Sequence, residues 1–234
     1  MTTAVVFFPG AGSFGNEFRK MVPALGCSAF VARYPGRHGR DFGIPAESFD
    51  ALVGSCVDQV TAQAGELPVL AGHSFGAYVA FATALRLQEA GRPVGALAVS
   101  GAASPGPVIV PAAAAGAPNQ VAAYLTSVDP ALLTAAPSPD WRDVIIGTTA
   151  DDMRLLRGYE PGRTVLNAPL HAAHGAEDPL TAGAGVAAWR SRAGTGFSAR
   201  VFPGGHSDFL GTPDWLSWIN GIRDGIRLSR DHDQ

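Results

Sequence analysis

The segment from Gly72 to Gly76 constrains the fold of this chain more than any other. It reads Gly-His-Ser-Phe-Gly and joins a short apolar stretch, Pro68–Ala71, to an Ala- and Leu-rich stretch, Phe75–Ala90. The first stretch is typical of a buried strand, and the second of a helix that ends at Gly91. A serine flanked by glycines at this junction predicts a tight strand-to-helix turn that holds the hydroxyl clear of the sheet.

Strands and helices are predicted to alternate on both sides of this turn. The other strand candidates are Ala4–Phe8, Ala29–Tyr34, Val94–Val99, Thr164–Ala173 and Phe197–Phe202. The other helix candidates are Ser48–Ala64 with Ser48 as N-cap, Gly183–Arg192 and Pro213–Leu228. This order predicts an α/β fold, a mostly parallel sheet with helices on both faces. A length of 234 residues, 47% of them hydrophobic, fits one domain over residues 1–234 that needs no disulfide or metal to fold.

One region interrupts the alternation. From Ala102 to about Arg163 there is no strand candidate, only a Pro-, Ala- and Gly-rich stretch followed by helical patterns at Gln120–Leu125 and Asp140–Leu156. About sixty residues are too many for a simple connection. We expect a helical insertion at about 102–163 that covers the C-terminal edge of the sheet, either as a mobile lid or as a fixed decoration.

Ser74 in the turn is the candidate nucleophile, and a serine hydroxyl needs a base that is oriented by an acid. In this type of fold the chain order is serine, then acid, then histidine. His206 follows the last predicted strand and is the candidate base. Asp178, held extended before Pro179, follows the preceding strand and is the candidate acid, with Glu177 as the neighbour that could be mistaken for it.

Other titratable residues near these positions are interpreted as structural. His171 and His174 lie in or beside a predicted strand, ahead of any candidate acid, so we expect them in the core or behind the site. Asp208 is interpreted as a solvated loop charge. The remaining histidines precede or adjoin the serine or lie near the C-terminus: His38, His73 and His232.

Acyl transfer through a serine also needs donors for the developing oxyanion. The backbone N–H of Phe75, next to the candidate nucleophile, is the first expected donor. The second is expected from the loop after the first strand, Phe8–Ser13, which reads Phe-Pro-Gly-Ala-Gly-Ser and whose glycines permit close approach of the backbone.

Four segments in order resemble the type II thioesterases of polyketide and nonribosomal peptide assembly lines, a family with the α/β-hydrolase fold. They are Phe8–Ser13, Tyr34–Arg40 (Tyr-Pro-Gly-Arg-His-Gly-Arg), Gly72–Ala77, and Gly204-Gly205-His206 with Phe209-Leu210. The resemblance implies hydrolysis of acyl groups from phosphopantetheine thioesters on acyl or peptidyl carrier proteins, and it suggests Ala11 as the second oxyanion donor. No metal or bound cofactor is required for this chemistry.

The chain departs from the family pattern at three places. Gly10 stands where members usually carry histidine, and Phe75 where methionine is common. Ser207 and Asp208 replace the usual aromatic pair after the histidine. The same triad would also serve a product-releasing acyltransferase or cyclase or a general carboxylesterase, and a catalytically silent binding module is a further alternative.

Charge and cysteine content limit the partners and the compartment. A net charge of −3 without a long basic run predicts no nucleic-acid or membrane partner. Arg33, Arg37 and Arg40 either contact an acidic carrier protein or its phosphate, or are structural or solvated. Cys27 and Cys56 are interpreted as buried thiols. The absence of a leader-like N-terminus and of an apolar run of ~18 residues favours a cytoplasmic protein.

Overall fold

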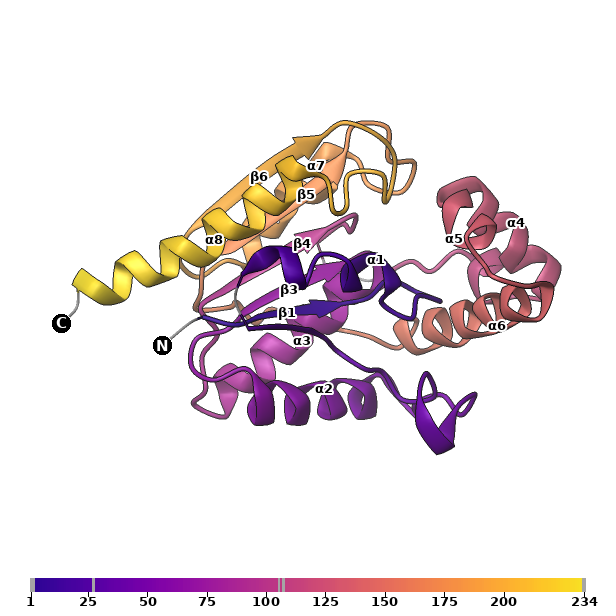
Figure 1. Ribbon diagram of the computed structural model, residues 1–234, viewed down its shortest axis with the longest axis horizontal. Coiled ribbons are helices and arrows are strands. Elements are labelled where there is room, and N and C mark those ends of the chain that lie inside the picture. Colours follow the sequence, from indigo (N-terminus) through magenta and orange to yellow (C-terminus); the bar gives the residue numbers. More distant parts are fainter. Residues whose placement is uncertain (1–2, 27, 105, 107, 233–234) are drawn as a thin grey trace.

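Six strands form the sheet of the computed structural model, which describes residues 3–26, 28–104, 106 and 108–232. Every paired neighbour runs parallel, in the order β2-β1-β3-β4-β5-β6 (Figure 1). The strands are β1 (Val5–Phe8), β2 (Ala29–Val31), β3 (Val69–His73), β4 (Ala96–Ser100), β5 (Leu170–Gly175) and β6 (Phe197–Phe202). The predicted parallel sheet is confirmed. Because all strands run the same way, their carboxyl ends lie at one edge of the sheet.

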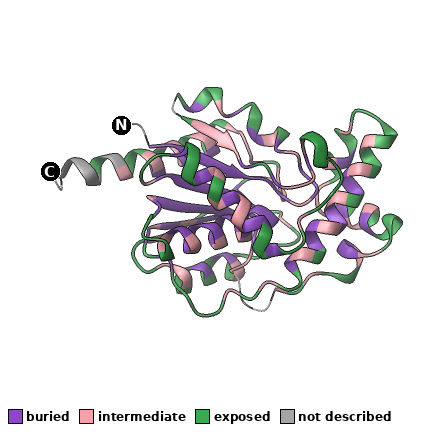
Figure 2. Ribbon diagram, turned by 90° about the horizontal axis from the view of Figure 1, so that it is seen from below, coloured by how far each residue is buried: buried purple, intermediate pink, exposed green. Residues whose placement is uncertain are grey.

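Helices cover both faces of this sheet, and those of the insertion lie beyond its edge. They are α1 (Asn16–Arg19), α2 (Phe49–Gln63), α3 (Phe75–Glu89), α4 (Pro118–Val128), α5 (Pro130–Thr134), α6 (Pro139–Leu156), α7 (Gly183–Ala187) and α8 (Pro213–His232). Short 3₁₀ turns lie at Pro23–Leu25, Gly39–Asp41, Ala112–Ala115 and Ala188–Arg192. The strands β1, β3, β4 and most of β5 are buried between the two helical layers, β2 is half-buried, and β6 is exposed along most of its length (Figure 2).

The alternation of side chains along β1 explains the two layers. Val6 and Phe8 point to the face covered by α2 and α3, whereas Val5 and Phe7 point to the face covered by α1 and α8. Phe7 stacks on Phe18 of α1 with ring centroids 4.9 Å apart and lies 5.9 Å from the ring of Trp215 in α8. A strand buried on both faces has to be apolar throughout, as this one is.

Several predicted boundaries were wrong, among them that of β2, which ends at Val31 instead of Tyr34. β5 begins at Leu170 instead of Thr164, because the Asn167 N–H donates to the Gln88 side chain at 2.6 Å and Pro169 has no N–H to donate. The predicted helix over 183–192 is divided into α7 and a 3₁₀ turn, and α8 continues past Leu228 to His232. The predicted N-cap Ser48 is confirmed, since its hydroxyl accepts from the Ala51 N–H at 3.0 Å.

The predicted insertion contains α4, α5 and α6, and no strand falls among its described residues. These helices gather beyond the C-terminal ends of the strands, at the opposite end from the two chain termini (Figure 1). They share a small apolar core of their own, formed by Val121, Leu125, Leu133, Ile145, Ile146 and Ala150. The insertion thus packs as a separate layer over the edge where all strands end.

Two findings bear on the compartment and thiol predictions. None of the described helices combines the length and the apolar character that a bilayer crossing needs. Cys56 is buried in the core, and burial raises its thiol pKa to about 12. The other cysteine, Cys27, lies outside the described residues.

Helix α3 approaches β1 backbone to backbone at Gly76. A Cβ atom at this position would lie 2.0 Å from the carbonyl oxygen of Phe8 and 2.5 Å from that of Pro9. No side chain therefore fits here, and the glycine lets the N-terminus of α3 pack directly against the end of β1.

Replacing this glycine tests that close approach. We expect Gly76→Ala to lower the free energy of unfolding by at least about 1–3 kcal/mol, because overpacked backbone has to move apart. The measurement is urea unfolding followed by circular dichroism. Gly147→Ala is the matched control, since Gly147 lies exposed in α6 with nothing within 4 Å of an added Cβ, and it should stabilise by roughly 0.5–1 kcal/mol. Equal stability of Gly76→Ala and the wild type would contradict the packing account.

Candidate active site

Ser74 lies in the predicted tight turn between β3 and α3. Its backbone has φ 54° and ψ −122°, a conformation that L-residues adopt only where the surroundings enforce it. Gly72 permits the tight turn, because a Cβ there would lie 2.3 Å from the carbonyl oxygen of Gly76. The Ser74 N–H donates to the carbonyl oxygen of Ser100 at 2.8 Å, which fixes the turn to the end of β4. The predicted turn is confirmed.

Asp178 and His206 come together because β5 and β6 are neighbours. The loops that follow these strands are joined by the Glu177 N–H, which donates to the Gly204 carbonyl oxygen at 3.0 Å. They touch at Gly175, where a Cβ would lie 2.0 Å from the carbonyl oxygen of Gly205. The His206 Nδ1 consequently lies 3.0 Å from the Asp178 Oδ2.

The Asp178 carboxylate uses both of its oxygens. Oδ1 accepts from the Leu180 N–H at 2.9 Å while Oδ2 meets the imidazole of His206. Burial alone would raise the pKa of Asp178, but its hydrogen bond with His206, the His206 charge and the Leu180 N–H outweigh burial and lower it. An ionised carboxylate only accepts, so the Nδ1–H of His206 is the donor in this bond.

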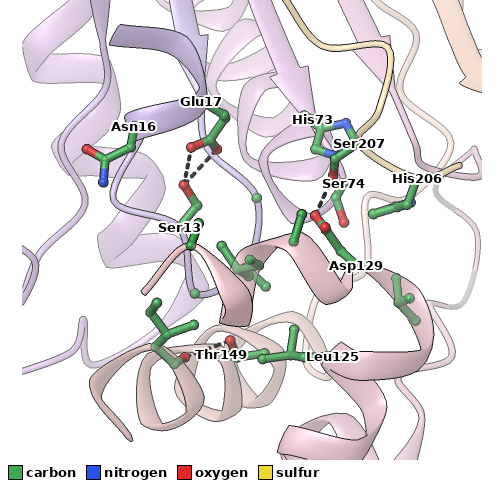
Figure 3. A pocket seen from close by; sticks show the side chains of 18 of the residues that line it. Ser13, Asn16, Glu17, His73, Ser74, Leu125, Asp129, Thr149, His206 and Ser207 are labelled. Carbon is green, nitrogen blue, oxygen red and sulfur yellow. Dashed lines mark hydrogen bonds between the residues drawn. The ribbon is translucent and has the colours of Figure 1, made fainter. Parts of the chain in front are cut away.

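Ser74, His206 and Ala11 line one cavity of about 480 Å³. Figure 3 shows Ser74 between His73 and Asp129, with His206 beside it. The wall opposite the sheet edge is apolar and comes from the insertion, through Leu125, Val128, Ala131, Leu132, Trp141 and Ile145. A pocket of this size with a few polar groups at one point is typical of a small-molecule site.

A polar cluster borders the same cavity on the α1 side. The Ser13 hydroxyl lies 2.6 and 2.5 Å from the two carboxylate oxygens of Glu17 (Figure 3). Burial is the largest cause of a raised pKa at Glu17, opposed by the Ser13 hydrogen bond and the charge of Arg37. This end of the cavity can therefore exchange hydrogen bonds with a ligand.

The loop after β1 lies against the turn that holds Ser74. A Cβ atom at Gly10 would lie 3.7 Å from the Ser74 Cβ, so the next residue, Ala11, is close to the serine. Among the described residues the Ala11 N–H has no protein acceptor. Phe75 is the first residue of α3, where N–H groups have no partner within the helix. Both amides are thus available to a ligand.

The Tyr-Pro-Gly-Arg segment forms hydrogen bonds with both ends of the loop after β1, at Pro9 and at Ser13. The Tyr34 hydroxyl donates to the carbonyl oxygen of Pro9 at 3.1 Å, and the Arg37 guanidinium donates to that of Ser13. Arg37 also stacks over the Tyr34 ring, 4.5 Å from its centroid. Arg37 is only 4% exposed, so the carrier-contact alternative is wrong for this residue, while Arg33 and Arg40 are exposed.

Arg37 forms a buried ion pair with Asp152 of α6, which is 5% exposed. The same carboxylate oxygen accepts from the Gly12 N–H at 2.8 Å, so the pair holds the loop just after Ala11, at Gly12 and Ser13. Burial raises the pKa of Asp152, and the Arg37 charge and the Gly12 N–H act in the opposite direction. No motif pointed to Asp152, because its partners lie far away in the sequence.

Of the other titratable residues interpreted as structural, His73 lines the cavity with its ring 4.8 Å from that of His206, whereas the following residues lie outside it. Glu177 and Asp208 are exposed, and Asp208 accepts from the Gly205 N–H at 2.8 Å instead of being only solvated. His171 is half-buried beside Ser198 and His174 is buried, and neither is among the described residues that line the cavity. No group of His, Cys, Asp or Glu in the described ranges is arranged to hold a metal ion.

A family model for the thioesterase domain matches residues 3–221. The chain belongs to this thioesterase family. A relative in Mycobacterium tuberculosis, phenyloxazoline synthase MbtB, is 29% identical over 210 residues, and the match covers 87% of this chain but 15% of the synthase. Thioesterase TesA of Mycobacterium marinum is 28% identical over 211 residues, with 87% of this chain and 79% of TesA covered.

A solved structure agrees with this assignment. The type II thioesterase BorB from the borrelidin biosynthetic cluster superposes with a TM-score of 0.82 at 25% identity, covering 95% of this chain and 93% of BorB. The α/β-hydrolase fold and the resemblance to type II thioesterases, both predicted from sequence, are confirmed.

The ion pair that grips the Gly10–Ser13 loop can be tested by stability. We expect Asp152→Ala to lower the free energy of unfolding by about 3–5 kcal/mol, because Arg37 is left buried without a counter-charge. The double variant Arg37→Met/Asp152→Leu should recover part of that loss, since no buried charge remains. Urea unfolding measures both. A double variant as unstable as Asp152→Ala would show that the unpaired charge is not the cause.

Proposed function

We propose that this chain hydrolyses acyl thioesters by a covalent mechanism in which Ser74 is the nucleophile, His206 the base and Asp178 the orienting acid. One observation carries the proposal. The hydrogen-bonded His206–Asp178 pair and the strained Ser74 turn meet at one cavity, beside the loop of Ala11. This combination is the arrangement that acyl transfer through serine requires.

In the first step the Ser74 oxygen attacks the thioester carbonyl carbon while the His206 Nε2 takes the hydroxyl proton. The carbonyl electrons move onto oxygen, where the N–H groups of Phe75 and Ala11 donate to the oxyanion. The tetrahedral intermediate then collapses, the C–S bond breaks, and the proton on His206 goes to the leaving thiolate. The acyl group stays on Ser74 as an ester.

In the second step water attacks that ester. His206 Nε2 takes a proton from the water, the same two N–H groups stabilise the oxyanion again, and the proton returns to the Ser74 oxygen as the free acid leaves. Asp178 stays ionised throughout, as its lowered pKa requires, and stabilises the charge on the imidazolium between the two proton transfers.

The substrate is proposed to be an acyl group on the phosphopantetheine arm of an acyl or peptidyl carrier protein. BorB, a type II thioesterase of a biosynthetic cluster, and the synthase MbtB support a role in polyketide or nonribosomal peptide pathways. The apolar wall contributed by the insertion suits an acyl chain, and it gives the insertion the role of a lid over Ser74. Hydrolysis there would clear acyl groups from stalled carriers.

Ser74→Ala tests the nucleophile. Covalent labelling by a fluorophosphonate should disappear, and kcat for an acyl-pantetheine thioester should fall by at least ~10³-fold, because no other group can form the acyl ester. Mass spectrometry and thiol release measure the two effects. Ser191→Ala, an exposed serine in the 3₁₀ turn after α7, should keep both. Labelling that persists in Ser74→Ala would rule out this serine.

The substrate class is tested by pairing two esters of one acyl chain. The wild type should cleave the pantetheine thioester with a higher kcat/KM than the p-nitrophenyl ester, and products from acyl-carrier thioesters should be free acids by mass. A marked preference for the oxygen ester would instead favour a carboxylesterase, and a cyclic or transferred product would favour a releasing enzyme.

A further inference from the structure

A line of hydrogen bonds joins the insertion to the turn that holds Ser74. The Ser207 hydroxyl donates to the Asp129 Oδ2 at 2.6 Å, and the same hydroxyl oxygen lies 3.1 Å from the His73 Nε2. Asp129 lies at the corner between α4 and α5, Ser207 follows His206, and His73 precedes Ser74 (Figure 3). The insertion is thus bonded directly to the loop that carries His206 and, through Ser207, to His73, which precedes Ser74.

The direction of each bond follows from the donors available. Ser207 gives its single hydrogen to the Asp129 carboxylate, so its oxygen accepts from the His73 Nε2–H. The His73 Nδ1 lies 3.1 Å from the hydroxyl of Ser100 at the end of β4, a hydroxyl that also lies 3.4 Å from the Gly72 carbonyl oxygen. Burial, assisted by the His206 charge, lowers the pKa of His73 well below its ordinary value. The ring is neutral and carries one proton, as this line of bonds requires.

Among the described residues, the α4–α5 corner makes no other side-chain hydrogen bond to the sheet or its loops. Its buried apolar side chains, Val121, Leu125 and Leu133, pack on α6 within the separate core of the insertion. The corner also presents Val128 and Leu132 to the cavity beside Ser74. The position of this apolar wall relative to the serine therefore depends on what holds the corner in place, and the carboxylate of Asp129 makes a direct bond that does so.

We propose that Asp129 is a positioning residue that fastens the α4–α5 corner over Ser74 through Ser207, and so assembles the apolar wall that selects longer acyl chains. The inference rests on the proposed thioesterase function for its effect on substrates, but its structural part does not. Ser207 is one of the positions where this chain departs from the family pattern, so the fastening is a property of this chain's own residues.

Chain length provides the first readout. An octanoyl chain contacts the wall formed by the corner, whereas an acetyl group ends beside Ser74. We expect Asp129→Ala to lower the ratio of kcat/KM for octanoyl- over acetyl-pantetheine about tenfold, mainly through KM for the octanoyl substrate. A merely structural defect would lower both substrates alike and leave the ratio unchanged, and that result would overturn the proposal.

Matched variants identify the bond itself. Ser207→Ala should change the ratio as Asp129→Ala does, and the double variant should be no worse than either single one, because the two side chains act as one unit. Ser207→Thr keeps the hydroxyl and should restore the wild-type ratio. Asp143→Ala, which removes an exposed carboxylate from α6, is the control for charge. Additive effects of the two single variants would overturn the proposal.

Hydrogen exchange gives a readout that needs no activity. Amides of residues 118–134 should exchange faster in Asp129→Ala and Ser207→Ala than in the wild type, while those of α3 stay protected. Unchanged exchange over 118–134 would overturn the fastening whatever the enzyme hydrolyses. Faster exchange in a protein whose wild type cleaves no thioester would instead refute the proposed function and leave the fastening intact.

Discussion

A buried pair of opposite charges, Arg37 and Asp152, holds together the three segments on which the candidate site depends. Arg37 follows β2, Asp152 belongs to α6 of the insertion, and both bond the loop after β1. Removing two charges from water is expensive, and well-packed apolar side chains would often be as stable. What the pair adds is a fixed position for the loop after β1. Asp152 accepts from the Gly12 N–H and Arg37 donates to the Ser13 carbonyl, both just after Ala11.

The loops that carry Ser74, His206 and Asp178 and the apolar wall of the cavity belong to different parts of the structure. The serine turn, the histidine loop and the acid loop are fixed by glycines at backbone contacts and by the register of parallel strands, so their geometry is rigid. The cavity wall comes from a layer with its own small core, joined to the sheet edge by a few polar contacts, among them Asp152 on α6 and Asp129 at the α4–α5 corner. In the proposed mechanism, changes in that layer would alter the choice of substrate without disturbing Ser74, His206 or Asp178.

Much of this site could be predicted from sequence, because its signals are local. The turn at Ser74 has a five-residue pattern, and Asp178 and His206 follow from the order of strands. The start of β5 could not be predicted, since it depends on a hydrogen bond from Asn167 to a side chain of α3. The partner of Arg37 lies 115 residues away in a region without strand or motif, so neither its structural role nor that of Asp129 left a signal.

That same separation affects how the protein is made. A ribosome releases the chain from its N-terminus, so the first strands and Arg37 emerge long before Asp152 does. Until α6 has been synthesised, the Arg37 guanidinium lacks its partner Asp152. The loop after β1 also lacks the acceptor for its Gly12 N–H. The loop after β1 therefore reaches its final form late in synthesis, after β1 to β4 have emerged. A nascent chain that stops before α6 carries Ser74 without the Asp152 contact to this loop.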